Sequence, residues 1–241
     1  MTNLTAFVFR FRVVIFVTLY VLGFSAPWEW PKPGGSLWLS ASTWVARTGL
    51  LGLSAATLSV TLAALGCLLL GTSLRLWGTA YLGSGVMGDA RMHGESLMAS
   101  GPYRYVRNPL YLGAWFLAVG VSILMPPSGA AFMLIAFSIF VLVLIRAEEG
   151  FLLEKQGQTY EDYRRRVPRL LPRMRTGIAS SAARPRWLQA MLAEIYPVGI
   201  TICFAIFAWR YNARILLRSV LICYGVSLIV RAVVKPAKNS A

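Results

Sequence analysis

Apolar stretches long enough to cross a lipid bilayer recur along this chain and restrict its fold more than any other feature. A spanning helix needs about 20 predominantly apolar residues. We mark six candidates, at residues 8–26, 50–73, 110–126, 129–146, 195–209 and 215–232. Only 14% of the 241 residues are charged, whereas a soluble domain carries about a quarter. A soluble fold of this length cannot bury so much apolar surface. The sequence therefore predicts an all-α, polytopic transmembrane bundle of about six helices.

Basic residues give the predicted bundle an orientation. A net charge of +15 would suggest nucleic acid on a soluble protein, but here lysine and arginine gather at the ends of apolar stretches and in one tail. Loops rich in these residues stay in the cytoplasm. We therefore expect residues 126–129 outside, and segments 74–109 and 146–176 inside with the N-terminus. Arg210 and Arg214, between the last two stretches, depart from this pattern. The chain is expected to be a multi-pass protein of the inner or plasma membrane that contacts anionic headgroups and no nucleic acid.

Changes in composition divide the chain into three regions. Residues 1–73 hold the first two apolar stretches and a tryptophan-rich loop at 27–47, which we expect at headgroup level. Residues 74–176 mix charge, aromatics, glycine and proline around the two central stretches, and form the predicted catalytic core. Residues 177–241 read as a basic linker and a helical hairpin without a motif. Cysteine and histidine lack the spacing of a metal site, so no metal is expected.

The first motif is a turn that leads into an apolar helix. It reads Ser-Gly-Pro-Tyr-Arg-Tyr-Val-Arg-Asn-Pro-Leu-Tyr-Leu-Gly over residues 100–113. Asn108 suits an N-cap and Pro109 the first helical turn, so the positive end of this helix would face the cytoplasm and attract a carboxylate. The tyrosines offer flat faces for an adenine ring or a sulfonium cation. An interfacial anchor of arginine and tyrosine beside a helix start explains the same residues equally well.

Two adjacent carboxylates, Glu148 and Glu149, form the second motif just after the fourth apolar stretch. Carboxylates at this place are costly against lipid, so they should face water, a partner or a bound cation. A solvated helix end with Glu149 paired to Arg146 is the alternative. The third and fourth stretches are joined by a tight turn and should be antiparallel neighbours. We therefore expect the glutamates to face the first motif across a cytoplasmic cleft.

The third motif, Gly-Gln-Thr-Tyr-Glu-Asp-Tyr-Arg-Arg-Arg-Val-Pro-Arg-Leu-Leu-Pro at 157–172, reads on its own as a basic amphipathic helix on anionic headgroups. In this order and spacing the three motifs resemble the isoprenylcysteine carboxyl methyltransferases and the related phospholipid methyltransferases. The resemblance covers roughly residues 74–173. It implies a membrane enzyme that transfers a methyl group from S-adenosylmethionine (SAM) to a lipophilic acceptor, either an isoprenylcysteine-like carboxylate or a phospholipid, with the cofactor site at the cytoplasmic face.

The resemblance also implies site residues. The positions that match the family's cofactor-binding segment are Leu97, Met98, Tyr103, Arg107, Asn108, Pro109, Leu110 and Tyr111. Glu148, the first glutamate of the pair, is expected to contact the cofactor too. Glu148 and Glu149 are candidates for a general base, and Arg146 for a substrate contact. Two positions depart from the family, since Asn108 replaces a histidine and Leu144 stands where the family has its substrate-side arginine.

Two other functions fit a polytopic helical chain. A membrane reductase of the steroid-reductase type, which uses NADPH, shares this helical plan and needs no glycine-rich dinucleotide fingerprint; binding of NADPH rather than SAM would identify it. A non-enzymatic transporter or scaffold is the second alternative. A transporter would place polar groups at mid-membrane, whereas here the polar groups gather at one end of the apolar stretches. Methyl transfer is the interpretation that we favour.

Overall fold

The computed structural model of the protein describes residues 11–25, 35–82, 100–173, 178, 184–210, 222–223 and 225–226. Within these ranges all regular secondary structure is helical, which confirms the predicted all-α class. The α-helices are α2 (Arg12–Ser25), α3 (Leu37–Arg47), α4 (Leu53–Leu82), α6 (Pro109–Ser122), α7 (Pro127–Gln156), α8 (Gln158–Arg166), α9 (Trp187–Ala193) and α10 (Ile195–Arg210). A 3-10 turn, η1 (Gly101–Arg104), precedes α6.

The apolar helices are those of an integral membrane protein. Helices α4 and α7 are each 30 residues long and apolar enough to cross a bilayer. Helices α9 and α10 meet at a bend of 74° and provide a third candidate if the pair forms one broken span. Helices α2 and α6 are apolar but shorter, with 14 residues each. Most of the predicted stretch 215–232 lies outside the described residues, so the total of six spans stays a prediction.

Two helices extend well beyond the apolar stretches that predicted them. Helix α4 continues nine residues past the expected end at residue 73, and α7 continues ten residues past residue 146 (82 − 73 and 156 − 146). Hydrophobicity marks only the part of a helix that suits lipid, whereas helix formation also continues through charged and aromatic residues. Helix α7 ends at Gln156, and the next residue, Gly157, has a φ of 58° that glycine adopts more readily than other residues.

The tryptophan-rich segment is helical where a loop was expected. Helix α3 begins after Ser36, whose side chain accepts a hydrogen bond from the backbone N–H of Leu39 at 3.4 Å. The indole of Trp38 points to α4, where it donates to Thr61 Oγ1 at 2.8 Å. Trp44 is 70% exposed, as an interfacial residue would be. The local cap and one interhelical bond therefore fix a helix over the second half of the predicted loop.

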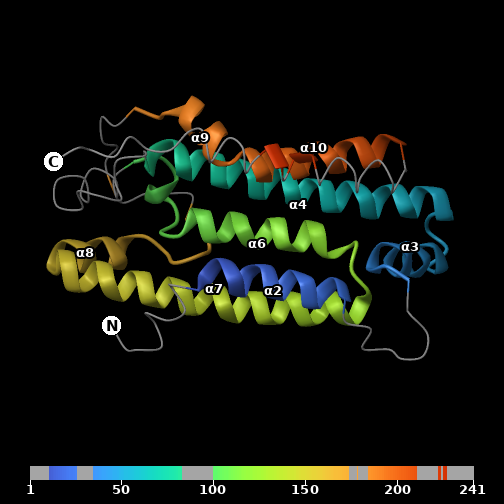
Figure 1. The fold of residues 1–241 in the computed structure, drawn as a ribbon, viewed down its shortest axis with the longest axis horizontal. Coiled ribbons are helices and arrows are strands. Elements are labelled where there is room, and N and C mark those ends of the chain that lie inside the picture. The colour runs from blue at the N-terminus through green and yellow to red at the C-terminus, as the bar shows by residue number, and fades with distance from the viewer. Residues whose placement is uncertain are drawn as a thin grey trace. The chain divides into compact units, whose positions relative to one another are not determined.

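The chain forms two compact units, and the first comprises residues 1–71 and 114–157. In this unit α2 packs along α7 (Figure 1). The two helices cross closely where Gly23 faces Gly129, so closely that a Cβ atom at Gly129 would collide with the carbonyl oxygen of Gly23. The ring of Phe137 on α7 packs edge-on against Phe16 and Tyr20 of α2, with centroids 5.5 and 6.3 Å apart. Small residues at such crossings let membrane helices approach closely.

The second unit comprises residues 72–113 and 158–241. It contains the end of α4, the start of α6, and all of α8, α9 and α10. The first motif and, from Gln158 onward, the third motif lie in this unit, and their surroundings determine the geometry of this part of the candidate site.

Candidate functional site

The end of helix α4 supports the first motif. The rings of Trp77 and Tyr105 lie 5.9 Å apart between centroids. One residue further along α4, the backbone of Gly78 lies against the start of α6, since a Cβ atom there would be 2.8 Å from Leu110 Cδ2. A larger side chain at Gly78 would displace residues of the motif. The glycine and the tryptophan therefore form part of the platform on which residues 101–110 rest.

The turn at the start of the motif depends on a glycine. Gly101 has a φ of +49°, which disfavours any side chain, and the ring of Tyr81 on α4 covers the position that a Cβ atom would occupy. Pro102 then fixes the first residues of η1, and the backbone N–H of Tyr103 donates to the carbonyl of Ser100 at 3.2 Å. Tyr103 is buried as a result.

Replacing this glycine should disturb the turn more than replacing a second glycine that also has a positive φ. Gly101→Ala is expected to lower the free energy of unfolding by about 1–3 kcal/mol, because backbone strain at a positive φ adds to a clash with Tyr81. Gly157→Ala is the control, since Gly157 has a φ of 58° and open space where a Cβ atom would lie; there backbone strain applies without a clash, so a smaller loss is expected. Unfolding in mixed detergent micelles measures both. Equal losses in the two variants would show that the Tyr81 contact does not matter.

Helix α8 and the residues after it hold the other side of the motif. The hydroxyl of Tyr163 donates to the carbonyl of Tyr103 at 2.9 Å. The backbone N–H of Arg173 donates to the carbonyl of Tyr105 at 3.0 Å. Both tyrosines of α8, Tyr160 and Tyr163, are buried, which explains why the third motif spaces them three residues apart on one helical face.

Arg107 and Asn108, two predicted cofactor ligands, bind backbone carbonyls of the third motif. Arg107 Nη1 donates to the carbonyls of Arg164 and Val167, the latter at 3.0 Å. These carbonyls lie at the end of α8, where helical partners are missing. Asn108 Nδ2 donates to the carbonyl of Arg169 at 3.2 Å. Both side chains thus fasten the two motifs together, and any contact that they make with a cofactor stays a prediction.

The start of α6 is where the sequence placed it. Pro109 is its first residue, and the carbonyl of Asn108 accepts the first helical hydrogen bond from the N–H of Leu112 at 3.0 Å. Asn108 therefore occupies the predicted N-cap position, although its side chain is directed to the residues after α8. Leu110 and Tyr111 are half-buried in the first turn.

The other predicted site residues lie on α7, in the first unit, or outside the described chain. Glu149 is buried with 5% of its surface exposed, Glu148 is half-buried, and Arg146 is exposed. Consecutive helical residues point about 100° apart, so the two glutamates cannot have the same surroundings. Leu97 and Met98 lie outside the described residues.

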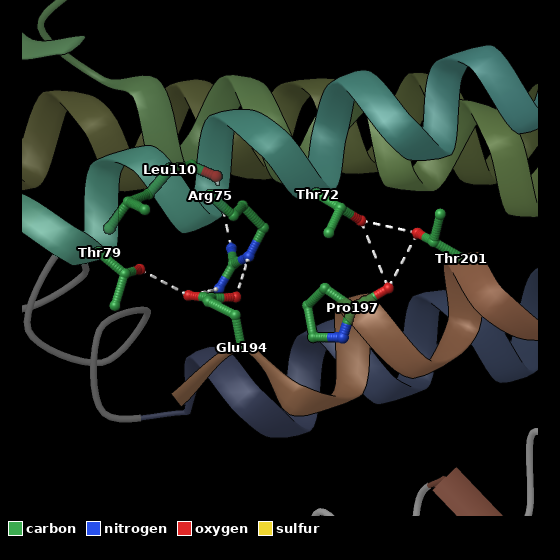
Figure 2. A network of polar contacts seen from close by, with 7 residues as sticks. All are labelled: Thr72, Arg75, Thr79, Leu110, Glu194, Pro197 and Thr201. Atoms are coloured by element: carbon green, nitrogen blue, oxygen red, sulfur yellow. Dashed lines mark hydrogen bonds and ion pairs between the residues drawn. The ribbon is translucent and has the colours of Figure 1, made fainter. Parts of the chain in front are cut away.

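A partly buried ion pair in the second unit was not predicted from the sequence. Figure 2 shows Arg75 of α4 against Glu194 at the bend between α9 and α10, with Nε 2.6 Å from Oε2 and Nη2 3.0 Å from Oε1. Thr79 Oγ1 donates to the same carboxylate at 2.8 Å. Each charge lies just outside a predicted apolar stretch, at the end of 50–73 or before 195–209. In the sequence, the feature that could have revealed this pair is a charged residue at the border of an apolar stretch.

Comparison with known proteins gives partial matches along the chain. Residues 59–159 match the family model described as phospholipid methyltransferase. Methanethiol S-methyltransferase of Crocosphaera subtropica is 43% identical over 70 residues, which cover 29% of this chain and 27% of that protein. Protein-S-isoprenylcysteine O-methyltransferase of Schizosaccharomyces pombe is 34% identical over 114 residues, 45% of this chain and 48% of that protein. Nickel-cobalt-cadmium resistance protein NccN of Alcaligenes xylosoxydans xylosoxydans is 29% identical over 164 residues, 68% and 63% of the two chains. No solved structure matches.

These matches cover part of each relative. The chain spans between about a quarter and a half of the two methyltransferases named above. The matched family region contains the first motif, the two glutamates and the first residues of the third motif. The resemblance inferred from the motifs is therefore confirmed. Over residues 59–159 the chain is similar to the phospholipid methyltransferases, and over 45% of its length it is similar to an isoprenylcysteine methyltransferase.

Proposed function

We propose that this protein transfers a methyl group from SAM to a lipophilic acceptor at the membrane. The observation that carries the proposal is the family match over 59–159, which contains the motif clamped between α4 and α8. The methyltransferase names of the relatives support it further. A site held on both sides by hydrogen bonds and ring contacts suits a reaction that depends on alignment.

The residues of the first motif are proposed to bind SAM together with Glu148. The start of α6 offers backbone N–H groups and a positive helix end to the carboxylate of the cofactor. Tyr103 and Tyr111 are the aromatic candidates for its adenine ring or sulfonium. Glu148 carries a negative charge that suits the cationic groups of SAM. Leu97 and Met98 join this site on the family resemblance alone.

The chemistry asks little of the protein beyond alignment and the exclusion of water. The methyl carbon of a sulfonium is already electrophilic, so an acceptor atom attacks it in line and the neutral thioether leaves. A carboxylate or thiolate acceptor needs no base. An amine or hydroxyl must lose a proton, for which Glu148 and Glu149 are the candidates. Arg146, exposed on α7, is proposed to contact an anionic part of the acceptor.

Helix α8 is proposed to rest on anionic headgroups at the cytoplasmic face. Arg164 and Arg165 share one carboxylate, Glu161, at 2.8 and 3.4 Å, and Arg166 is exposed beside them. The exposed side of α8 therefore keeps an excess of positive charge, which anionic lipids attract by about 1 kcal/mol for each basic residue.

Binding of SAM by the purified full-length protein tests the proposal. Calorimetry should give a dissociation constant for SAM between about 1 μM and 1 mM, the usual range for enzyme substrates, and no heat with NADPH. Labelled methyl should then pass into a prenylcysteine analogue or phospholipid vesicles. Absence of SAM binding would contradict the proposal, and binding of NADPH would favour a reductase. Transfer to methanethiol alone would keep the enzyme class and refute the lipophilic acceptor.

A further inference from the structure

A set of polar residues on α4 meets a second set at the bend between α9 and α10 and on α10. Within each set the residues are three or four positions apart and therefore lie on one side of their segment. They are Thr72, Arg75 and Thr79 on α4, and Glu194, Pro197 and Thr201 at the bend and on α10 (Figure 2). We call this contact the polar seam. In an apolar environment such contacts hold helices together, because hydrocarbon offers polar groups no other partner.

One end of the polar seam is uncharged. Thr72 Oγ1 lies 2.7 Å from Thr201 Oγ1 and donates to the carbonyl of Pro197 at 3.3 Å. Thr201 Oγ1 also contacts this carbonyl, at 3.0 Å. Both threonines are buried, with 7% and 6% of their surfaces exposed. These bonds join α4 to α10, so we assign this end to the docking of the two helices.

The charged end of the polar seam reaches a third helix. Arg75 Nε and Nη2 donate to the carboxylate of Glu194, and the remaining nitrogen, Nη1, donates to the carbonyl of Leu110 at 3.4 Å. Leu110 belongs to the first turn of α6, beside the predicted cofactor residues. The planar guanidinium has a fixed fork of donors, so the two bonds to Glu194 determine where Nη1 points. Thr79 in turn holds the carboxylate of Glu194.

We propose that Arg75 and Glu194 are positioning residues, which hold the first turn of α6 in the place that SAM binding requires. The inference rests on the proposed function, because it assigns the effect to the cofactor. It gives a purpose to the C-terminal segment, whose sequence carries no motif. Through Glu194 the bend between α9 and α10 orients Arg75, and through Arg75 it restrains the helix start that is proposed to receive the carboxylate of SAM.

Variants at the two ends of the polar seam separate positioning from docking. Arg75→Met with Glu194→Met removes the charged end without leaving a buried charge, so the protein should still fold. Thr72→Val with Thr201→Val removes the uncharged end and is the matched control. A third variant, Arg75→Lys, keeps an ion pair with Glu194 but has no planar fork that could also reach Leu110. Each variant is compared with the wild type as the full chain in detergent.

Two measurements are made on every protein. The double methionine variant and Arg75→Lys should bind SAM about three- to tenfold more weakly, the loss expected for one hydrogen bond of modest strength. Their backbone amides at residues 112–115, the first that are bonded within α6, should exchange hydrogen faster. The threonine control should keep the wild-type affinity within about twofold. Unchanged exchange at 112–115, unchanged SAM affinity in both Arg75 variants, or an equal loss in the threonine control would each overturn the inference.

Failure of the proposed function can be distinguished from failure of this inference. A wild-type protein that binds no SAM refutes the methyltransferase proposal directly. Hydrogen exchange at residues 112–115 needs no cofactor, and would still show whether the ion pair restrains the start of α6.

Discussion

Arg75→Met alone is expected to lower the free energy of unfolding by about 3–5 kcal/mol, the usual cost of leaving one partner of a buried ion pair unmatched. Glu194 is 4% exposed and would keep only Thr79 as a partner within the network of Figure 2. The side chain of Arg75 is 26% exposed, so water reaches the pair from one side and the lower end of the range is expected. Unfolding of the full chain in mixed micelles of mild detergent and SDS measures the change.

A second substitution provides the control for this prediction. Adding Glu194→Met to Arg75→Met should restore most of the lost stability, because a buried ion pair replaced as a whole by apolar residues costs little. The double variant should therefore be more stable than the single variant, although it carries one more substitution. If the single and double variants unfold alike, Glu194 is not a buried charge that depends on Arg75, and the contact contributes no more than an exposed pair.

The sequence predicted helices wherever the apolar stretches were long, and missed structure that depends on local caps or on packing. Helices α2, α4, α6, α7 and α10 each coincide with a predicted stretch. Helix α3 was missed because its tryptophans were interpreted only as interfacial residues. The cap at Ser36 and the bond from Trp38 to α4 show that they also belong to a helix. Hydrophobicity alone did not predict where α4 and α7 end.

The candidate site, too, could be predicted from the sequence only in part. The order of the three motifs was enough to reveal the resemblance to the methyltransferase family, because it depends on side chains whose spacing is visible in the sequence. The acceptors of Arg107 and Asn108 are backbone carbonyls, which every residue possesses and no pattern reveals. Arg75 and Glu194 are 119 residues apart, and only the folding of α10 against α4 brings them together. Tertiary contacts of this kind could not be predicted from local spacing.

Glu148→Gln is expected to weaken SAM binding about 10- to 100-fold and to reduce methyl transfer accordingly. A hydrogen bond to a charged group contributes about 1.5–3 kcal/mol, and each 1.4 kcal/mol corresponds to about a factor of ten in affinity. Glutamine preserves the shape of the side chain and removes its charge, so the loss reports the attraction to the cationic cofactor. Calorimetry with SAM and transfer of labelled methyl, measured as kcat/KM for SAM, give the two numbers.

Two neighbours on α7 make this prediction specific. Glu154 is exposed on the same helix, so Glu154→Gln removes an equal charge and should leave SAM affinity within about twofold of the wild type. Glu149 is buried, and Glu149→Gln should chiefly lower stability, since a buried charged group has partners inside the protein. A loss of SAM affinity in Glu149→Gln but not in Glu148→Gln would exchange their proposed roles. Because the two side chains point in different directions from one helix, only one of them is expected to contact the cofactor.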